Sequence, residues 1–395
     1  MTITIRPARW LLGALLALAC AAAGAQIIRP IVIRPLPLPD PESFVEISAG
    51  LNHTCARKLN GKTYCWGRND QGQIGFESTQ LCGGVACVAR PRYVMTGRQV
   101  EAGAAHSCAI DSAGAAWCWG SDSHGQLGNA PDPYSVRPTP FPVSGGHQFH
   151  TISAGETSTC GTSPEGLFCW GSIAGSAALP LQLSTNASFQ SVSVGRAHAC
   201  ALYVVNSYRG AYCWGQNQYG QSGVDWNAWS GAVPFAFNSS LGTAVARLQT
   251  QGDFTCADQI NGQVQCTGLN QYGQLGSGQS FSATYVPQTV GVAMALAGVA
   301  TGWNHACALD PNGLASCWGN GYWGQLGNAA SDVFRGPQPV AGGRSYRAIA
   351  SGFQHSCAIG TDNRIYCWGD NRFGQLGLGQ GGSWYWTPMT TLDPV

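Results

Sequence analysis

Histidine and cysteine recur in this chain at a spacing that could hold a metal ion. The first copy reads His53-Thr54-Cys55, and Cys65 follows after an Asn-Gly turn. Imidazole and thiolate groups are ligands that zinc prefers in proteins. The pattern supplies only three of the four ligands that a structural zinc site needs, and paired cysteines can instead form a disulfide bond. A repeated metal site and a repeated disulfide are therefore the two chemistries to weigh.

The pattern occurs seven times along the chain, at intervals of about 50 residues. A catalytic site occurs once, so a motif that recurs in every copy indicates architecture. Six of the second cysteines open a Cys-Trp-Gly sequence, and six copies continue into Gly-Gln-x-Gly. The cysteine pairs are Cys55 with Cys65, Cys108 with Cys118, Cys160 with Cys169, Cys200 with Cys213, Cys256 with Cys266, Cys307 with Cys317, and Cys357 with Cys367.

The N-terminus is typical of an export signal. Two arginines precede an apolar run that ends at Ala23, and small residues stand before Gln26. We expect residues 1–25 to be a signal peptide, and the apolar run is too short for a transmembrane segment. Lipid attachment at Cys20 is the alternative. Export would place the protein in the periplasm or the medium.

Cleavage before Gln26 would leave sixteen of the seventeen cysteines. The seven repeated pairs and a further pair, Cys82 with Cys87, account for all of them. An even number of cysteines in an exported chain predicts disulfide bonds, so we favour disulfides and expect no metal. Residues 26–43 contain five prolines and are interpreted as a linker or arm outside the core.

Each copy contains four candidate strands. An alternating run such as residues 44–50 comes first, then the His-x-Cys strand, a turn such as Asn60-Gly61, and the Cys-Trp-Gly strand. A proline marks the fourth strand, as in residues 91–94, and we expect it at the strand start or at a sheet edge. Seven such units predict an all-β fold, a seven-bladed β-propeller of four-stranded antiparallel blades over residues 44–395. A closed ring favours a monomer, and opposed cysteines should have Cα atoms about 4.5–5.5 Å apart.

The repeated residues resemble a known family. The sequences Gly-x-x-His-x-Cys-Ala-Leu and Tyr-Cys-Trp-Gly-x-Asn-x-x-Gly-Gln-Leu-Gly are similar to the repeat of the regulator of chromosome condensation family. The resemblance implies a seven-bladed propeller that binds proteins through loops on one face. Founding members are nucleotide exchange factors for a nuclear GTPase, and other relatives include secreted bacterial inhibitors of β-lactamases. Cysteine replaces an apolar residue of the family pattern, which suggests an exported, disulfide-bearing branch.

Loop parity predicts which face carries the binding residues. Successive loops of an antiparallel blade alternate between its two ends, so the Gly-x-x-His loops and the Gly-Gln-x-Gly connectors should share one face. Aromatic residues on loops are typical of protein interfaces. The candidate partner-binding residues are Trp226, Trp229, Trp303, Phe353, Trp384 and Trp386.

Other recurring residues have a structural interpretation. The aromatic residues before Gly-Gln-x-Gly should pack against the next blade; they are Tyr219, Tyr272, Trp323 and Phe373. The repeated histidines should hydrogen-bond to the backbone between blades; they are His53, His106, His198, His305 and His355. The loop closed by Cys82 and Cys87 is either a braced insertion or a functional loop.

These features predict a non-enzymatic binding scaffold without a cofactor. The expected partner is a protein, with carbohydrate second. Nucleic acid is disfavoured because only 10% of residues are charged and the net charge is +1. One alternative is a lyase or hydrolase with a site at the axial mouth, where Glu156, Arg196 and Asp253 are the charged loop residues. Another is an exchange factor, which would require an intracellular chain.

Overall fold

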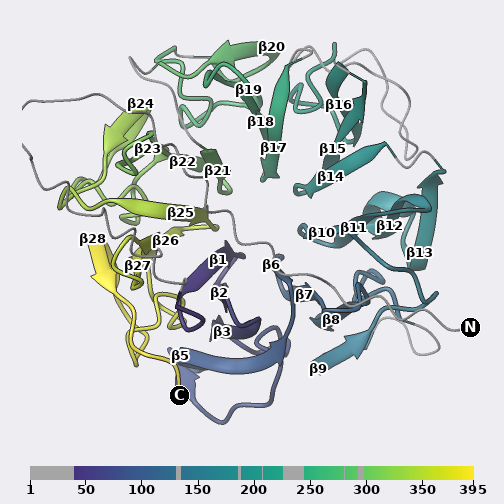
Figure 1. Ribbon diagram of the computed structural model, residues 1–395. Coiled ribbons are helices and arrows are strands. Elements are labelled where there is room, and N and C mark those ends of the chain that lie inside the picture. Colours follow the sequence, from purple (N-terminus) through teal and green to yellow (C-terminus); the bar gives the residue numbers. More distant parts are fainter. Residues whose placement is uncertain are drawn as a thin grey trace, which may run out of the picture. The chain divides into compact units, whose positions relative to one another are not determined.

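Seven antiparallel sheets form a ring in the computed structural model, and the chain is a seven-bladed β-propeller (Figure 1). The structure describes residues 40–129, 135–185, 188–206, 208–225, 244–279, 281–291 and 298–395. The predicted signal peptide, residues 26–39 of the predicted arm, and both Trp226 and Trp229 lie outside these ranges. No helix within the described ranges is long and apolar enough to cross a membrane.

The blades follow one another along the chain, and the strands have these bounds. Blade 1 contains β1 (Phe44–Ala49), β2 (His53–Lys58), β3 (Lys62–Arg68), β4 (Leu81–Cys82) and β5 (Val85–Thr96); blade 2 contains β6 (Gln99–Ala102), β7 (His106–Ile110), β8 (Ala116–Gly120) and β9 (Arg137–Pro142). Blade 3 contains β10 (Thr151–Ala154), β11 (Ser158–Ser163), β12 (Gly166–Gly171), the 3-10 helix η1 (Ser172–Ala174) and β13 (Ala177–Ser184). The described part of blade 4 contains β14 (Phe189–Val194), β15 (His198–Val205) and β16 (Tyr208–Gly215). Blade 5 contains β17 (Val245–Gln251), β18 (Phe254–Gln259), β19 (Val264–Leu269) and β20 (Ala283–Thr289); blade 6 contains β21 (Gly298–Thr301), β22 (His305–Leu309), β23 (Ala315–Asn320) and β24 (Val333–Pro339). Blade 7 contains β25 (Tyr346–Ser351), β26 (His355–Gly360), β27 (Ile365–Asp370) and β28 (Trp384–Thr390).

The first strand of each blade is the innermost one, a point on which the sequence is silent. Strands β1, β6, β10, β14, β17, β21 and β25 surround the axis in Figure 1, and all seven line a common axial cavity. Most of these strands end in small residues, such as Ser48-Ala49 in β1 and Ser153-Ala154 in β10. Small side chains let seven strand ends converge without steric conflict.

The cysteines form disulfides across neighbouring strands. The described ranges contain eight disulfide bonds, and each joins a pair predicted from the sequence. The bonds join Cys55 with Cys65, Cys82 with Cys87, Cys108 with Cys118, Cys160 with Cys169, Cys200 with Cys213, Cys256 with Cys266, Cys307 with Cys317, and Cys357 with Cys367. Because the sulfur atoms are bonded to each other, they are not available as thiolate ligands for a metal.

The spacing across the repeated disulfides differs from the prediction. In each blade the two cysteines oppose one another directly, as Cys55 and Cys65 do on β2 and β3. The Cα atoms of the seven repeated pairs lie 4.0–4.1 Å apart, so the predicted separation of about 4.5–5.5 Å is wrong. The bond between the sulfur atoms draws the two strands together at this point.

The prolines of the outer strands lie within bulges rather than at strand starts. In β28, Met389 opposes Cys367 and Tyr385 opposes Gly369, so Pro388 stands inside an irregular stretch of the pairing. The same shift brackets Pro337 in β24 and Pro287 in β20. The prediction of a strand start or a sheet edge is therefore confirmed by the edge position of these strands. A proline is accepted there because the bulge removes the ladder hydrogen bond that it cannot donate.

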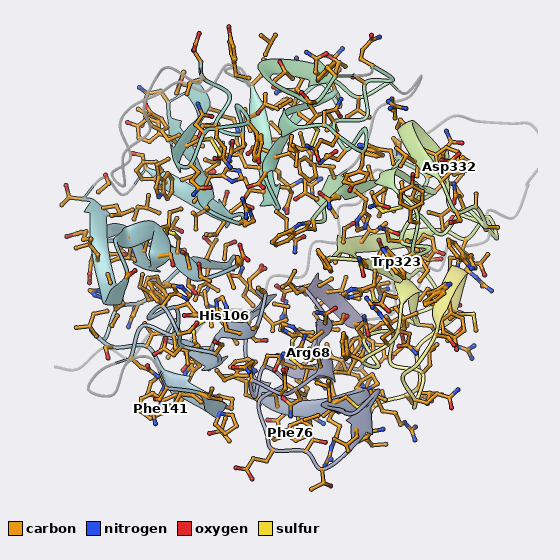
Figure 2. The ribbon with its side chains drawn as sticks, turned by 180° about the vertical axis from the view of Figure 1, so that it is seen from behind. Arg68, Phe76, His106, Phe141, Trp323 and Asp332 are labelled. Carbon is orange, nitrogen blue, oxygen red and sulfur yellow. A yellow bond between two sulfur atoms is a disulfide. The ribbon has the colours of Figure 1, made fainter. Side chains whose placement is uncertain are left out.

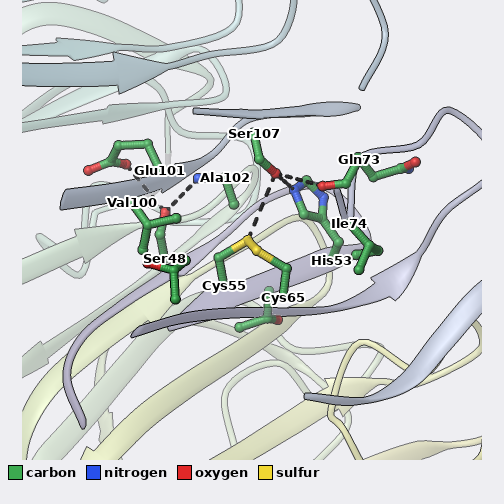
Figure 3. The surroundings of a disulfide bond; sticks show 12 residues. Ser48, His53, Cys55, Cys65, Gln73, Ile74, Val100, Glu101, Ala102 and Ser107 are labelled. Atoms are coloured by element: carbon green, nitrogen blue, oxygen red, sulfur yellow. Dashed lines mark hydrogen bonds between the residues drawn. A yellow bond between two sulfur atoms is a disulfide. The ribbon is translucent and has the colours of Figure 1, made fainter. Parts of the chain in front are cut away.

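Neighbouring blades are joined by a buried latch of side chains. His106 lies well inside the ring, whereas Phe141 of β9 lies at the rim (Figure 2). The histidine Nε2 contacts a hydroxyl of the next blade, as His53 does with Ser107 at 2.8 Å (Figure 3). Ser107 donates in turn to the carbonyl of Gln73 in the Gly-Gln-x-Gly connector, and Trp119 Nε1 donates to the same carbonyl at 2.9 Å. The prediction of backbone partners for these histidines is wrong, because their partners across the blade junction are hydroxyls.

The latch recurs at five junctions. The histidine and hydroxyl pairs are His53–Ser107, His106–Thr159, His198–Thr255, His305–Ser356 and His355–Thr54, with separations of 2.8–3.0 Å. Where the histidine is replaced, by Ser158 in blade 3 and by Phe254 in blade 5, the next blade carries alanine at the hydroxyl position. Blade 3 also lacks the Gly-Gln-x-Gly connector, and the indole Nε1 of Trp214 in blade 4 has no partner within the described ranges.

Blades 1 and 7 close the ring without sharing a sheet. Thr54 contacts His355 at 2.9 Å and donates to the carbonyl of Gln375 at 3.0 Å. The hairpin closed by the Cys82–Cys87 disulfide adds to this junction, because the Cys82 side chain packs against Gly374 and Gly381 of blade 7. The backbone geometry therefore supports the braced insertion that is one of the two interpretations of this loop.

Candidate functional site

One face of the propeller carries both sets of loops that the sequence analysis singled out. In blade 7, Arg372 of the Gly-Gln-x-Gly connector donates from Nη2 to Gln354 Oε1 of the Gly-x-x-His tip at 2.9 Å. In blade 1, the backbone N–H of Arg68 before the connector donates to the Asn52 carbonyl of the tip at 2.8 Å. We call this surface the loop face.

The tips of the loop face form a hydrogen-bonded collar around the axis. At six junctions the first residue after the tip glycine donates its N–H to the glycine carbonyl of another tip: Leu51 to Gly103, Ala104 to Gly155, Glu156 to Gly195, Arg196 to Gly252, Trp303 to Gly352 and Phe353 to Gly50, at 2.9–3.3 Å. A Cβ on Gly50 would lie 2.2 Å from the Gly103 carbonyl oxygen. The Gly-x-x-His motif therefore needs glycine for this close approach.

A depression at the centre of the collar has a mixed aromatic and charged lining. We call it the axial mouth; its lining includes Leu51, Glu156, Arg196, Gln251 and Trp303. The Trp303 ring packs edge-on against Phe353, with centroids 5.4 Å apart. Both residues are half-buried. Two of the candidate partner-binding residues therefore come together at this place.

The charged tip residues also meet at the axial mouth. Arg196 Nε lies 3.0 Å from an oxygen of Asp253, and the hydrogen bond to Asp253 raises the pKa of the arginine. Burial raises the pKa of Glu156, against the opposing charge of Arg196. Arg196 and Asp253 neutralise each other, so the axial mouth carries a fixed pair of opposite charges.

A second feature of the loop face is a row of aromatic and arginine side chains across blades 6, 7 and 1. Trp384 and Trp323 are in edge contact with centroids 5.5 Å apart. Arg372 lies over Trp323 at 5.1 Å and over Phe373 at 5.9 Å, and Arg68 lies over Phe373 at 5.0 Å. We call these five residues the aromatic–arginine row. Trp323 and Arg68, two of its members, are labelled in Figure 2.

The aromatic–arginine row contains some of the residues that the sequence analysis named and two that it did not name. Trp323 and Phe373 pack against the next blade, as expected of the aromatic before Gly-Gln-x-Gly, yet both stay half-exposed. Trp384 is 43% exposed and belongs to the row, whereas Trp386 lies half-buried in the bulged stretch of β28. Sequence reasoning missed Arg68 and Arg372. The available signal was their position, since Arg68 directly precedes the repeated Asn-x-x-Gly-Gln segment and Arg372 lies within it.

Two family models for the regulator of chromosome condensation (RCC1) repeat match the chain. One matches residues 44–73, 98–126 and 346–375, and the other matches residues 60–110, 113–161, 261–309 and 312–359. Together they cover more than half of the chain.

Individual proteins show the same similarity. The human regulator of chromosome condensation is 26% identical over 335 residues, which cover 76% of this chain and 78% of that protein. The human E3 ubiquitin-protein ligase HERC2 is 23% identical over 303 residues, and this chain spans 5% of its length. The crystal structure of Prp20p from Saccharomyces cerevisiae matches with a TM-score of 0.71 at 18% identity, covering 89% of this chain and 88% of that one. The repeat matches and the seven-bladed ring together place this chain in the regulator of chromosome condensation repeat family.

Proposed function

We propose that this chain is an exported, non-enzymatic scaffold that binds a protein partner on its loop face. The observation that carries the proposal is the gathering of half-exposed tryptophan, phenylalanine and arginine side chains on that face. Trp303 lines the axial mouth and packs against Phe353, and the aromatic–arginine row extends from blade 6 to blade 1. Tryptophan and arginine are enriched among residues that dominate binding energy at protein interfaces.

The rigidity of the loop face supports the proposal. The collar fixes the tips by backbone hydrogen bonds, and Arg372 is held by Asp370 and Gln354. A preorganised surface loses little conformational entropy on binding, so more of the contact energy appears as affinity. Prp20p from Saccharomyces cerevisiae, a propeller of the same fold, is described with binding properties to Gsp1p and histones, which is a protein-binding role.

Export is the second part of the proposal. The N-terminal apolar run and the eight disulfides support it together, because a reducing cytosol would keep these cysteines as thiols. The same argument disfavours an intracellular exchange factor. The location is tested by the intact mass of the protein from separated periplasm, medium and cytoplasm of its host. Cytoplasmic protein with a retained N-terminus and free thiols would contradict export.

The binding face is tested by comparing variants in affinity enrichment from the compartment in which the protein is found. The Trp303→Ala/Phe353→Ala and Trp323→Ala/Arg372→Ala variants remove the two features of the loop face. Phe141→Ala is the matched control, because Phe141 is also partly exposed but lies on outer strand β9. We expect a partner that the control captures as well as wild type does, and that at least one double variant loses. A partner retained equally by every variant would overturn the assignment of the face.

A further inference from the structure

A polar cavity of about 170 Å³ lies on the propeller axis, below the axial mouth. The innermost strands surround it, and six of them contribute hydroxyl-bearing residues to its lining: Ser48, Ser153, Ser193, Thr250, Thr301 and Ser351. Glu46 and Glu101 are the titratable residues among its described lining, which contains no lysine or arginine. The cavity therefore combines neutral oxygen acceptors with two carboxyl groups.

The two glutamates differ in their partners. Glu46 accepts a hydrogen bond from Arg57 Nε at 2.6 Å, so its charge is compensated. Glu101 accepts hydrogen bonds from Ser48 Oγ at 3.3 Å and from Gln99 Nε2 at 3.2 Å, and it has no ion pair within the described ranges (Figure 3 shows Ser48 and Glu101). Burial, followed by the nearby charge of Glu46, raises the pKa of Glu101 to about 8. A carboxylate is costly in this place without a cation, so Glu101 holds a proton at pH 7, and a positive ligand would favour its ionised form.

A second observation points to a ligand independently of the acids. Thr301 and Ser351 both line the cavity, and each residue is only 4% exposed. Neither hydroxyl oxygen has a hydrogen-bond partner in the part of the chain that the structure describes. Buried polar groups in native proteins normally have partners, so these two unpaired hydroxyls are costly as they stand. Both oxygens are covered in this structure, and a donor in the cavity could reach them only after their side chains rotate.

The cavity adjoins the axial mouth. Ala154 and Gln251 line both the cavity and the axial mouth. Gln251 of blade 5 donates from Nε2 to the carbonyl of Ala49 in blade 1 at 3.2 Å, so its side chain spans the axis between the two spaces. The cavity and the axial mouth therefore share part of their walls.

We propose that the axial cavity binds a primary ammonium group, with Glu101 as its counter-ion and the neutral oxygens of the inner strands as its other acceptors. An alkylammonium carries one positive charge and three N–H donors, which suits one uncompensated carboxylate surrounded by hydroxyls. Divalent ions favour several carboxylates, and the described residues contain no group of three or more metal-ligating side chains. The volume corresponds to about six waters at roughly 30 Å³ each, enough for a short alkyl chain.

Calorimetric titration of the oxidised full-length protein with n-butylammonium chloride tests the proposal. Glu101→Gln preserves the size of the side chain and removes its charge, and Glu165→Gln on the exposed turn of blade 3 is the matched control. We expect binding to wild type and to Glu165→Gln, and an affinity about 10- to 100-fold weaker for Glu101→Gln. n-Butanol and potassium chloride should neither bind nor compete. Equal affinity for Glu101→Gln, equal binding of n-butanol, or displacement by potassium would overturn the proposal.

A second readout needs no variant and remains available if Glu101→Gln fails to fold. The charged groups that face Glu101 are Glu46 and its partner Arg57, so an entering ammonium meets a carboxyl that is largely protonated at pH 7. Binding should release a proton, which appears as a dependence of the heat on the ionisation enthalpy of the buffer. Binding without proton release would exclude Glu101 as the counter-ion. Nα-acetyl-lysine N-methylamide separates the two sources: if it binds, a partner's lysine can enter, and if only n-butylammonium binds, the ligand is a free amine.

Discussion

Lowering the pH from 7 to 5 should destabilise the propeller through its five latch histidines. Burial lowers the pKa of His53, His198 and His305 to about 3, and that of His106 and His355 to about 4. In the unfolded chain these groups titrate near 6.5. Below pH 6.5 the unfolded state therefore binds protons that the folded state does not bind. The stability present above pH 6.5 is lost as the pH falls toward the pKa values of the folded state.

The magnitude follows from the size of the shifts. Each pKa unit corresponds to about 1.4 kcal/mol, so each histidine costs about 2 kcal/mol at pH 5, and five cost about 10 kcal/mol. Glu101 acts in the opposite direction, because its pKa is raised from 4.5 to about 8 and acid relieves its burial. That relief is about 2–3 kcal/mol between pH 7 and 5. These groups together predict a loss of about 7 kcal/mol, comparable with the whole stability of many domains.

Denaturant unfolding at intervals between pH 7 and 5, with the disulfides intact, measures this loss. Near pH 5.5 the slope should correspond to about four protons taken up on unfolding, five by histidines and one released by Glu101. His106→Gln should remove about one of these protons. Ser158→Ala alters the equivalent position of blade 3, where Ser158 accepts a hydrogen bond from the N–H of Ile173, and should lower stability without changing the slope. A flat pH profile, or one that His106→Gln leaves unchanged, would refute the role of the buried histidines.

Three further outcomes are expected. Thr54→Val removes the hydroxyl that joins His355 and Gln375 at the ring closure, and should lower the free energy of unfolding by about 1–3 kcal/mol. Thr159→Val, at the junction of blades 2 and 3, should have an effect of the same size. An unchanged denaturation midpoint in both variants would contradict the latch. Cys82→Ser/Cys87→Ser should speed amide hydrogen exchange at the junction of blades 1 and 7 and leave blade 5 protected; uniform protection would contradict the bracing role. Reduction of the native protein should add sixteen hydrogens to its intact mass, and a smaller gain would show unpaired cysteines.

The repeat made the fold readable from sequence. Hairpin turns such as Asn60-Gly61 and the recurring cysteine pairs specify local strand pairing, and local pairing repeated seven times leaves a closed ring as the consistent solution. The sequence could not show which strand is innermost. The loops alternate between the two faces, and side chains alternate along each strand, in the same way whether the first or the fourth strand lies at the axis. The small residues that end β1 and its equivalents decide it, and their effect is visible only when the strands converge.

The latch partners were also present in the sequence. Positions 54, 107, 159, 255 and 356 carry serine or threonine where the preceding blade has a histidine, and Ala199 and Ala306 occupy the same position where it does not. The histidine of one copy is matched with the hydroxyl of the next copy, so aligning the copies position by position does not reveal the match. Once two blades are placed side by side, the hydroxyl is required because a buried imidazole N–H needs an acceptor.

The candidate binding residues were harder to predict because their arrangement combines residues of three different copies. The aromatic–arginine row needs Arg372 of blade 7 between Trp323 of blade 6 and Phe373, and Arg68 of blade 1 beyond them. Each residue taken alone resembles an ordinary connector position. Symmetric residues build the ring and offer every blade the same surface, so they cannot distinguish one partner orientation from another. The proposed recognition should therefore depend on positions where the copies differ, and the aromatic–arginine row and the axial mouth each bring several such positions together.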